Sequence, residues 1–180
     1  MDPYHNIHKK PAAAAKRLAP ILEARAGEQQ QVELRGRVFA SVLKGLPSSQ
    51  PLTVVDIGCG TGALARDIAR RPSVCRVVGI DPSPFLVQEA QRLAAADPHH
   101  GKLEFRKGMG NQLPVGGGFA DVAFIWTVLC HVPQGEVAAI LVDARRILKP
   151  GGRLVVADNE LSGWRAVSYT HLTLPTTPYV

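Results

Sequence analysis

Cysteine is scarce in this chain of 180 residues, which contains only Cys59, Cys75 and Cys130. Their number is odd, they lie far apart, and no two of them form a Cys-x-x-Cys pair, so a disulfide framework and a zinc site are both disfavoured. Free thiols at such spacings are typical of a reducing compartment. We therefore expect no metal site and a cytoplasmic location.

Long apolar runs are also missing. No 18 consecutive residues are apolar, and the N-terminus lacks the apolar core of a signal peptide. We expect neither a membrane span nor secretion. Hydrophobic residues still make up 46% of the chain, which is enough for about one globular domain with a sizeable core.

Aromatic residues are few, at 6% of the chain, and they do not alternate with basic residues. The net charge is +6, but nucleic-acid surfaces that stack bases need aromatic side chains among the cations. The basic residues form separated pairs, which we interpret as solvated helix faces: Lys9-Lys10, Lys16-Arg17, Arg70-Arg71 and Arg145-Arg146. A nucleic-acid partner is not expected.

Glycine, by contrast, recurs at alternate positions in residues 54 to 65, the most informative segment of the chain. An apolar strand there runs through Asp56 into Gly58, Gly60 and Gly62. Glycine tolerates positive φ and lets the backbone approach a ligand closely, so this turn predicts a nucleotide-type site. Gly58, Gly60 and Ala63 also satisfy the dinucleotide fingerprint, which leaves a nicotinamide enzyme open at this point.

Strand and helix patterns alternate from residue 52 onward. This alternation predicts an α/β fold with a doubly wound, mostly parallel sheet, whose ligands bind beyond the carboxyl ends of the strands. The expected strands are 52–57, 76–80, 103–106, 121–126 and 153–158.

Helices are predicted on both sides of these strands. Residues 1–15 are expected to be poorly ordered, and 17–45 to form two amphipathic helices. Their apolar stripes are Leu18, Ile21 and Leu22, then Val38, Phe39, Val42 and Leu43. Later helices are signalled by the Ser83-Pro84 cap with its stripe Leu86, Ala90 and Leu93, and by the stripe Val137, Leu141, Ala144 and Leu148 before the stop at 149–152.

Asp81 ends the second strand, 23 residues after Gly58. A carboxylate there can accept two hydrogen bonds from the hydroxyls of a ribose, which fits either adenosine cofactor. Three details favour S-adenosylmethionine: Asp56 two positions before the first glycine, the third glycine Gly62, and Lys-Pro-Gly-Gly at 149–152 before the last strand. With them, residues 30 to 160 resemble a class I S-adenosylmethionine-dependent methyltransferase.

The resemblance implies a Rossmann-like methyltransferase fold and a role for each matching segment. The glycine turn would face the amino-acid end of S-adenosylmethionine, with Asp56 orienting the turn or, through water, the ammonium group. Asp81 would hold the ribose, and Pro82 and Ser83 would flank the adenine. The full set of implied cofactor contacts is Asp56, Gly58, Cys59, Gly60, Gly62, Asp81, Pro82, Met109, Gly110 and Trp126.

Two segments need separate interpretation. The family commonly has Gly-Asp-Ala after the third strand, with the acid accepting from the adenine amino group, but this chain has Met109, a poor acceptor. The adenine edge would then be bound by backbone groups at 109 and 110, and the thioether would pack on the ring. The segment from Trp126 to His131 resembles the part of small-molecule methyltransferases that faces the methyl group. His131 is the candidate catalytic base, and a packing role is the alternative for both Trp126 and His131.

The predicted function is methyl transfer to a small-molecule acceptor. RNA or protein methylation is the first alternative, although the Asn/Asp-Pro-Pro-Tyr/Phe run of amino-directed nucleic-acid enzymes is missing from 126–133. A nicotinamide oxidoreductase and an inactive cofactor-binding fragment are the others. The acceptor, the methylated atom and the oligomeric state are not specified by these patterns.

The chain is predicted to have three parts. Residues 1–50 would be a helical segment acting as a lid, and 51–166 the S-adenosylmethionine-binding domain. Residues 167–180 resemble a translated sequencing adapter, and a genuine Thr/Pro-rich tail is the alternative. On the first interpretation the native frame ends near Ala166, and the last strands of the family's sheet would be missing.

Overall fold

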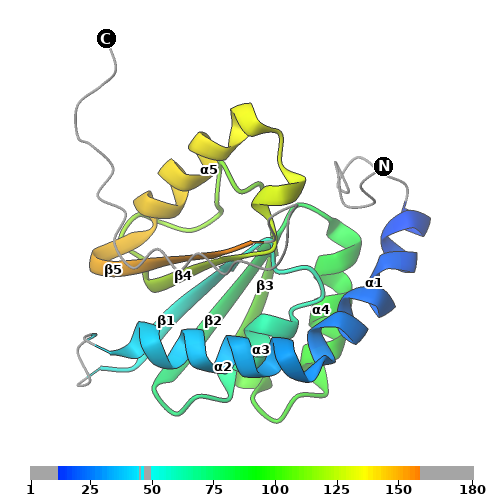
Figure 1. Ribbon diagram of the computed structural model, residues 1–180, viewed down its shortest axis with the longest axis horizontal. Coiled ribbons are helices and arrows are strands. Elements are labelled where there is room, and N and C mark those ends of the chain that lie inside the picture. The colour runs from blue at the N-terminus through cyan, green and yellow to red at the C-terminus, as the bar shows by residue number, and fades with distance from the viewer. Residues whose placement is uncertain (1–11, 45, 47–49, 159–180) are drawn as a thin grey trace.

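The computed structural model describes residues 12–44, 46 and 50–158 (Figure 1). Its strands form one parallel sheet in the order β3-β2-β1-β4-β5, so the winding direction reverses between β1 and β4. The predicted doubly wound α/β fold is confirmed. The strands are β1 (Leu52–Ile57), β2 (Val74–Asp81), β3 (Leu103–Lys107), β4 (Ala120–Trp126) and β5 (Leu148–Ala157).

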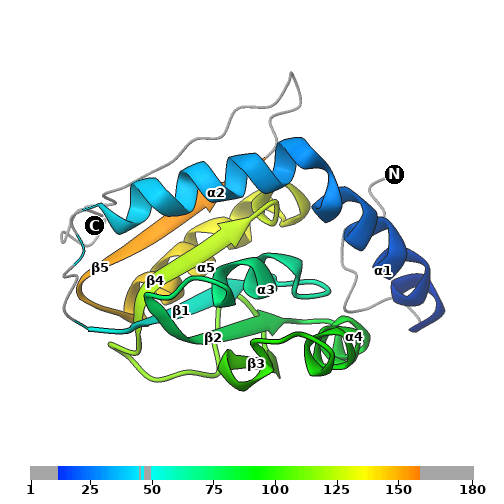
Figure 2. The same cartoon turned by 90° about the horizontal axis from the view of Figure 1, so that it is seen from below.

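Helices cover both faces of this sheet (Figures 1 and 2). Phe39 and Val42 of α2 share one core cluster with α3 and α4, whereas Ile140 and Ala144 of α5 belong to the cluster on the opposite face. The helices are α1 (Ala12–Gly27), α2 (Gln29–Leu43), α3 (Ala63–Ala69), α4 (Pro84–Ala95) and α5 (Gln134–Arg146), with single 3₁₀ turns η2 (His100–Lys102) and η3 (Leu129–His131).

The N-terminal helices differ in part from the prediction. The expectation of poor order is wrong for 12–15, because α1 begins at Ala12 in a run of alanines, the strongest helix formers. Residues 1–11 lie outside the described residues. Leu18 is buried as predicted and so is its neighbour Ala19, but Ile21 is 49% exposed, so α1 packs on α4 and α2 through a face that leaves Ile21 out.

The start of α4 follows the sequence prediction closely. Ser83 Oγ accepts from the Leu86 N–H at 3.4 Å, and Pro84 occupies the first turn. Leu86 and Ala90 are buried, whereas Leu93 is only partly buried. The cap therefore fixes the start of the helix at Pro84, three residues after Asp81.

The last strand begins earlier than predicted. β5 starts at Leu148, which pairs with Ala120, and the next pair is Val122 with Arg153, so residues 149–152 form a bulge within the strand. Gly151 has a φ of 77°, and a Cβ on Gly152 would lie 2.9 Å from the Lys149 carbonyl oxygen. The glycines therefore allow a bulge where the sequence predicted a helix stop.

This early strand also corrects the stripe predicted for the helix before it. Leu148 belongs to β5, and the deeply buried residues of α5 are Ile140 and Ala144. None of the helices in the described ranges combines the length and apolar character needed to cross a membrane. The predicted tail 167–180 and the question of further strands fall outside the described residues.

Candidate functional site

A cavity of about 480 Å³ opens at the carboxyl ends of β1, β2 and β4, where the strand order reverses. Its size is ordinary for a small-molecule site. Ten of the eleven residues predicted for the site line it, and Gly62 does not. The ten are Asp56, Gly58, Cys59, Gly60, Asp81, Pro82, Met109, Gly110, Trp126 and His131.

The glycine turn leaves β1 in a left-handed conformation, with φ values of 75° at Gly58, 54° at Gly60 and 78° at Gly62. A Cβ on Gly58 would lie 2.4 Å from a methyl of Val128, and one on Gly62 would lie 2.6 Å from the Phe105 ring. Gly58 therefore keeps the turn tight beside the cavity. Gly62 instead lets the start of α3 pack on β3, which explains its absence from the cavity wall.

Asp81 ties the glycine turn to the start of α4. One carboxylate oxygen accepts from the Gly60 N–H at 2.9 Å, and the other accepts from the Ser83 N–H at 2.9 Å. Burial raises the pKa of Asp81 to about 6, against the effect of these two hydrogen bonds. The carboxylate is thereby fixed in place at the cavity wall, with lone pairs left for a ligand.

Asp56 is the least satisfied polar group of the site. It is 2% exposed, and among the described residues its Oδ2 has no hydrogen-bond partner. Burial, and then the neighbouring Asp81, raise the pKa of Asp56 to about 7, while Arg35 and a backbone hydrogen bond from Ala65 act in the opposite direction. A buried acceptor without a partner is costly, so this oxygen is a ready partner for a bound donor or cation.

Cys59 lies between these two carboxyl groups in the turn and is buried. Burial, followed by the charges of Asp81 and Asp56, raises the pKa of the Cys59 thiol well above its ordinary value. A neutral buried thiol is a poor nucleophile, so Cys59 contributes packing to the turn.

The junction of α1 and α2 supplies a wall that sequence reasoning missed. Arg35 is 8% exposed on this wall, where its Nε donates to Asp67 Oδ2 at 2.8 Å and its Nη2 donates to the Ala26 carbonyl at 2.6 Å. Arg35 precedes Phe39 by one helical turn, and this spacing on the apolar stripe could have revealed that it points inward. The missed wall residues here are Leu22, which was predicted only as part of an apolar helix stripe, and Arg25, Ala26, Glu28, Gln31 and Arg35.

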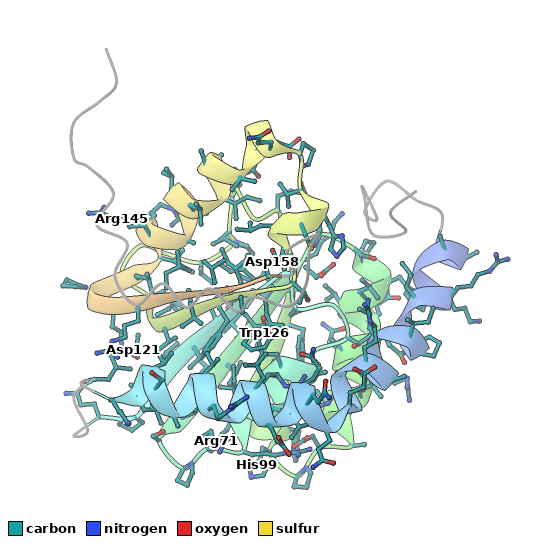
Figure 3. The ribbon with its side chains drawn as sticks, in the orientation of Figure 1. Arg71, His99, Asp121, Trp126, Arg145 and Asp158 are labelled. Carbon is teal, nitrogen blue, oxygen red and sulfur yellow. The ribbon has the colours of Figure 1, made fainter. Side chains whose placement is uncertain are left out.

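The segment after β4 forms the opposite wall. Trp126 lines the cavity and also packs against the core cluster on the α2 face, so a packing position does not remove it from the cavity wall (Figure 3). His131 is half-buried at the end of η3, and its backbone N–H donates to the Val128 carbonyl at 3.0 Å. Thr127 and Val128, within the predicted segment, also line the cavity. The wall residues that sequence reasoning missed here are Val132, Pro133, Glu136 and Ile140.

Met109 and Gly110 close the β3 end of the cavity. Met109 is 38% exposed, and a Cβ on Gly110 would lie 3.3 Å from Ile140. The loop that follows is held to α5, because the Leu113 N–H donates to Asp143 at 2.6 Å and Arg146 Nη1 donates to the Val115 carbonyl at 2.9 Å. The thioether is therefore presented on a fixed loop.

Residues 54–152 match the family model described as a methyltransferase domain. The chain belongs to the class I S-adenosylmethionine-dependent methyltransferase family. The chain is 33% identical over 122 residues to an O-methyltransferase from Pyrenophora dematioidea, covering 68% of the chain and 45% of that protein. It is 38% identical over 107 residues to a demethylmenaquinone methyltransferase from Tropheryma whipplei, covering 58% and 41%. The chain thus spans less than half the length of these curated relatives.

Solved structures agree with the family. The methyltransferase in a complex with the Trm112 activator of Haloferax volcanii is 28% identical, with a TM-score of 0.56 over 79% of this chain and 60% of that one. The [4+2]-cyclase SpnF is 26% identical, with a TM-score of 0.64 over 73% and 46%. Since a cyclase shares the fold, the reaction of this methyltransferase-family chain has to be argued from its site.

Proposed function

We propose that this chain binds S-adenosylmethionine in the cavity and transfers its methyl group to a small-molecule acceptor. The observation that carries the proposal is the unpartnered Oδ2 of Asp56, buried beside a glycine turn and one strand from Asp81. A buried carboxyl group of this kind suits a cofactor that is cationic at both its ammonium and its sulfonium centre.

The remaining contacts divide along the length of the cofactor. Gly58 and Gly60 allow the backbone to approach the amino-acid end, and Asp81 accepts from the ribose hydroxyls while holding the turn. Pro82 and the loop at Met109 and Gly110 enclose the adenine through apolar contact and backbone groups. Gly62 contributes indirectly, by packing the turn against Phe105.

When bound, S-adenosylmethionine supplies an electrophilic methyl group on a positively charged sulfur. The protein has to align the acceptor nucleophile with that methyl group, and positioning alone can account for a large part of the acceleration. Trp126 and Val128 flank the cavity where this alignment takes place. His131, on the same wall, would take the proton from a hydroxyl acceptor.

An acceptor with an apolar body suits the part of the cavity wall that the cofactor would not contact. Leu22, Val128, Val132 and Ile140 line the cavity from both sides of its mouth. The names of the relatives include O-methyltransferase and demethylmenaquinone methyltransferase, which support acceptors of small size. We keep the cytoplasmic location as a prediction and leave the methylated atom open.

Isothermal titration of the folded chain with S-adenosylhomocysteine, and in parallel with NADH, tests the proposal. Circular dichroism first confirms that the sample is folded. We expect saturable binding of S-adenosylhomocysteine alone. NADH binding alone would contradict the proposal in favour of an oxidoreductase, and a folded chain that binds neither would be an inactive fragment.

A further inference from the structure

Thr127, directly after β4, has a backbone conformation that its residue type rarely adopts. Its φ is 53°, and within residues 12–44, 46 and 50–158 it is the one non-glycine residue with a positive φ. A β-branched side chain in this region crowds its own backbone. Strain of this kind persists only where the surroundings impose it, and it gathers at functional sites.

The turn at Thr127 changes the face to which the next side chain points. Side chains along a strand alternate, so Phe124 and Trp126 pack with the cluster on the α2 face, and Ile125 packs with the cluster on the α5 face. An extended Thr127 would send Val128 to the same face as Trp126. Val128 instead packs with the α5-face cluster. The left-handed residue therefore reverses the alternation.

This reversal places Val128 directly on the glycine turn. A Cβ on Gly58 would lie 2.4 Å from one Val128 methyl and 3.0 Å from the other, so the methyl groups occupy the space that the missing side chain leaves. Gly58, Trp126 and Val128 all line the cavity. Trp126 and Val128 consequently bound the cavity from opposite faces of the sheet.

Two hydrogen bonds hold the strained residue on either side. The Thr127 N–H donates to the Ala157 carbonyl at 2.7 Å, which completes the last pair of β4 with β5, Trp126 with Ala157. The His131 N–H then donates to the Val128 carbonyl at 3.0 Å and closes the turn that follows. The fold therefore over-determines the conformation of Thr127.

We propose that Thr127 is a positioning residue: its left-handed turn places Val128 against Gly58, opposite Trp126, and so sets the width of the cavity at the glycine turn. The role rests on the proposed function, because donor and acceptor would meet in this gap. The backbone conformation performs it, and the hydroxyl group is dispensable.

Two substitutions separate the turn from the hydroxyl group. Thr127→Pro forces φ to about −65° and removes the N–H, whereas Thr127→Asn tolerates a left-handed conformation and lacks the β-branch. We expect Thr127→Pro to weaken S-adenosylhomocysteine binding about tenfold or more relative to the wild type. Thr127→Asn should bind nearly as well as the wild type and should have a higher unfolding midpoint than Thr127→Pro. Equal losses in the two variants would overturn the inference, and so would wild-type affinity in Thr127→Pro.

A double-mutant cycle tests the contact itself without proline. Gly58→Ala introduces the clash with Val128, and Val128→Ala removes the two methyl groups that cause it. We expect the loss of S-adenosylhomocysteine affinity from Gly58→Ala to be about threefold smaller in the Val128→Ala background. Val142→Ala, at a side chain 61% exposed on α5, is the matched control and should leave binding unchanged.

The outcomes of this cycle distinguish the two proposals. Additive effects of Gly58→Ala and Val128→Ala, in a wild-type chain that binds S-adenosylhomocysteine, would overturn the role of Thr127 alone. A folded wild-type chain that fails to bind S-adenosylhomocysteine would overturn the proposed function and this role together.

Discussion

The two ends of the parallel sheet use aspartate in opposite ways. At the amino ends of the strands, Asp121 accepts from Lys149 Nζ at 2.9 Å and from the Thr53 N–H at 2.8 Å (Figure 3). At the carboxyl ends, Asp56 and Asp81 are 2% and 5% exposed, and only backbone N–H groups in the described ranges donate to Asp81. The first aspartate is paired with a cation, and the other two are buried beside one another.

This difference separates an interaction that supports the fold from one that costs stability. Burial raises the pKa of Asp56 to about 7 and that of Asp81 to about 6, so each carboxylate is ionised at an energetic cost. Perturbed groups that share a cavity are typical of functional sites. At the carboxyl ends, a bound cation would therefore pair with the buried carboxyl groups, whereas Asp121 at the amino ends is already paired with Lys149.

The largest contrast is expected from removing one cation at each end. Arg35 is 8% exposed in its pair with Asp67, and Lys149 is 40% exposed in its pair with Asp121. Arg35→Met leaves the partly buried Asp67 carboxylate with only the exposed Arg70, 3.8 Å away, and is expected to lower the free energy of unfolding by about 3 kcal/mol. Lys149→Met should lower it by about 1 kcal/mol or less. Urea denaturation measures both, and equal losses would show that burial does not distinguish the two pairs.

The pH dependence of stability tests the same contrast through Asp56. An unfolded aspartate titrates near 3.9, so between about pH 4 and pH 7 the folded state keeps a proton on Asp56 that the unfolded state has lost. The free energy of unfolding should therefore fall as the pH rises through this window. Asp56→Asn is expected to flatten this fall and to be more stable than the wild type near pH 8, by about 1–4 kcal/mol.

Denaturation curves at several pH values measure this effect, with Asp121→Asn as the control. Asp121 pairs with Lys149 away from the cavity, so this variant controls for the loss of an aspartate elsewhere in the fold. A wild-type slope in Asp56→Asn would mean that Asp56 is already ionised in the folded protein at low pH.

Ligand binding should depend on the aspartate at the carboxyl ends of the strands and not on the one at the amino ends. Asp81→Ala removes the proposed ribose acceptor and the link to Gly60, and is expected to weaken S-adenosylhomocysteine binding about 10- to 100-fold, as the loss of charged hydrogen bonds implies. Asp121→Ala should leave the affinity unchanged and lower the unfolding midpoint. Titration calorimetry measures the affinity of both variants, and thermal melts measure their unfolding midpoints. If Asp81→Ala and Asp121→Ala bound S-adenosylhomocysteine with similar affinity, Asp81 would not belong to the binding site.

Local spacing was enough to predict most of the carboxyl end. Glycines at alternate positions and an acid at the end of the next strand leave few possible backbone paths, so Gly58, Gly60 and Asp81 could be placed from sequence. Arg35 was missed although its spacing from Phe39 on the helix indicates an inward direction, because its partners Asp67 and Ala26 come near only in the folded chain. The bulge at 149–152 was hidden for a similar reason, since Lys-Pro-Gly-Gly ends a helix and permits a bulge equally well.

Thr127 shows a different limit of sequence reasoning. A β-branched residue predicts extended backbone, so local preference gave no sign of the left-handed turn. The contact between Val128 and Gly58, and the pairing with Ala157, outweigh that preference. The unpredicted parts of the site are thus those in which tertiary contacts override local preference.

The smallest effect is expected at Met109, at the β3 end of the cavity. Its side chain is 38% exposed, so Met109→Ala should remove a limited apolar contact with the adenine and weaken S-adenosylhomocysteine binding by about two- to fivefold. This loss should be smaller than that of Asp81→Ala. Equal effects would contradict the assignment of Asp81 to the ribose, because an exposed thioether cannot match a buried charged acceptor.

Met109→Asp sharpens the same test by adding a carboxylate acceptor where the wild-type chain has a thioether. We expect it to bind S-adenosylhomocysteine more tightly than Met109→Ala, and to lose that advantage with S-inosylhomocysteine, whose base lacks the amino group. The wild type should discriminate less between these two ligands, since a thioether accepts hydrogen bonds poorly. If Met109→Asp showed no preference for the amino-bearing ligand, the adenine would not lie at this loop, and the orientation proposed for the cofactor would have to be reversed along the cavity.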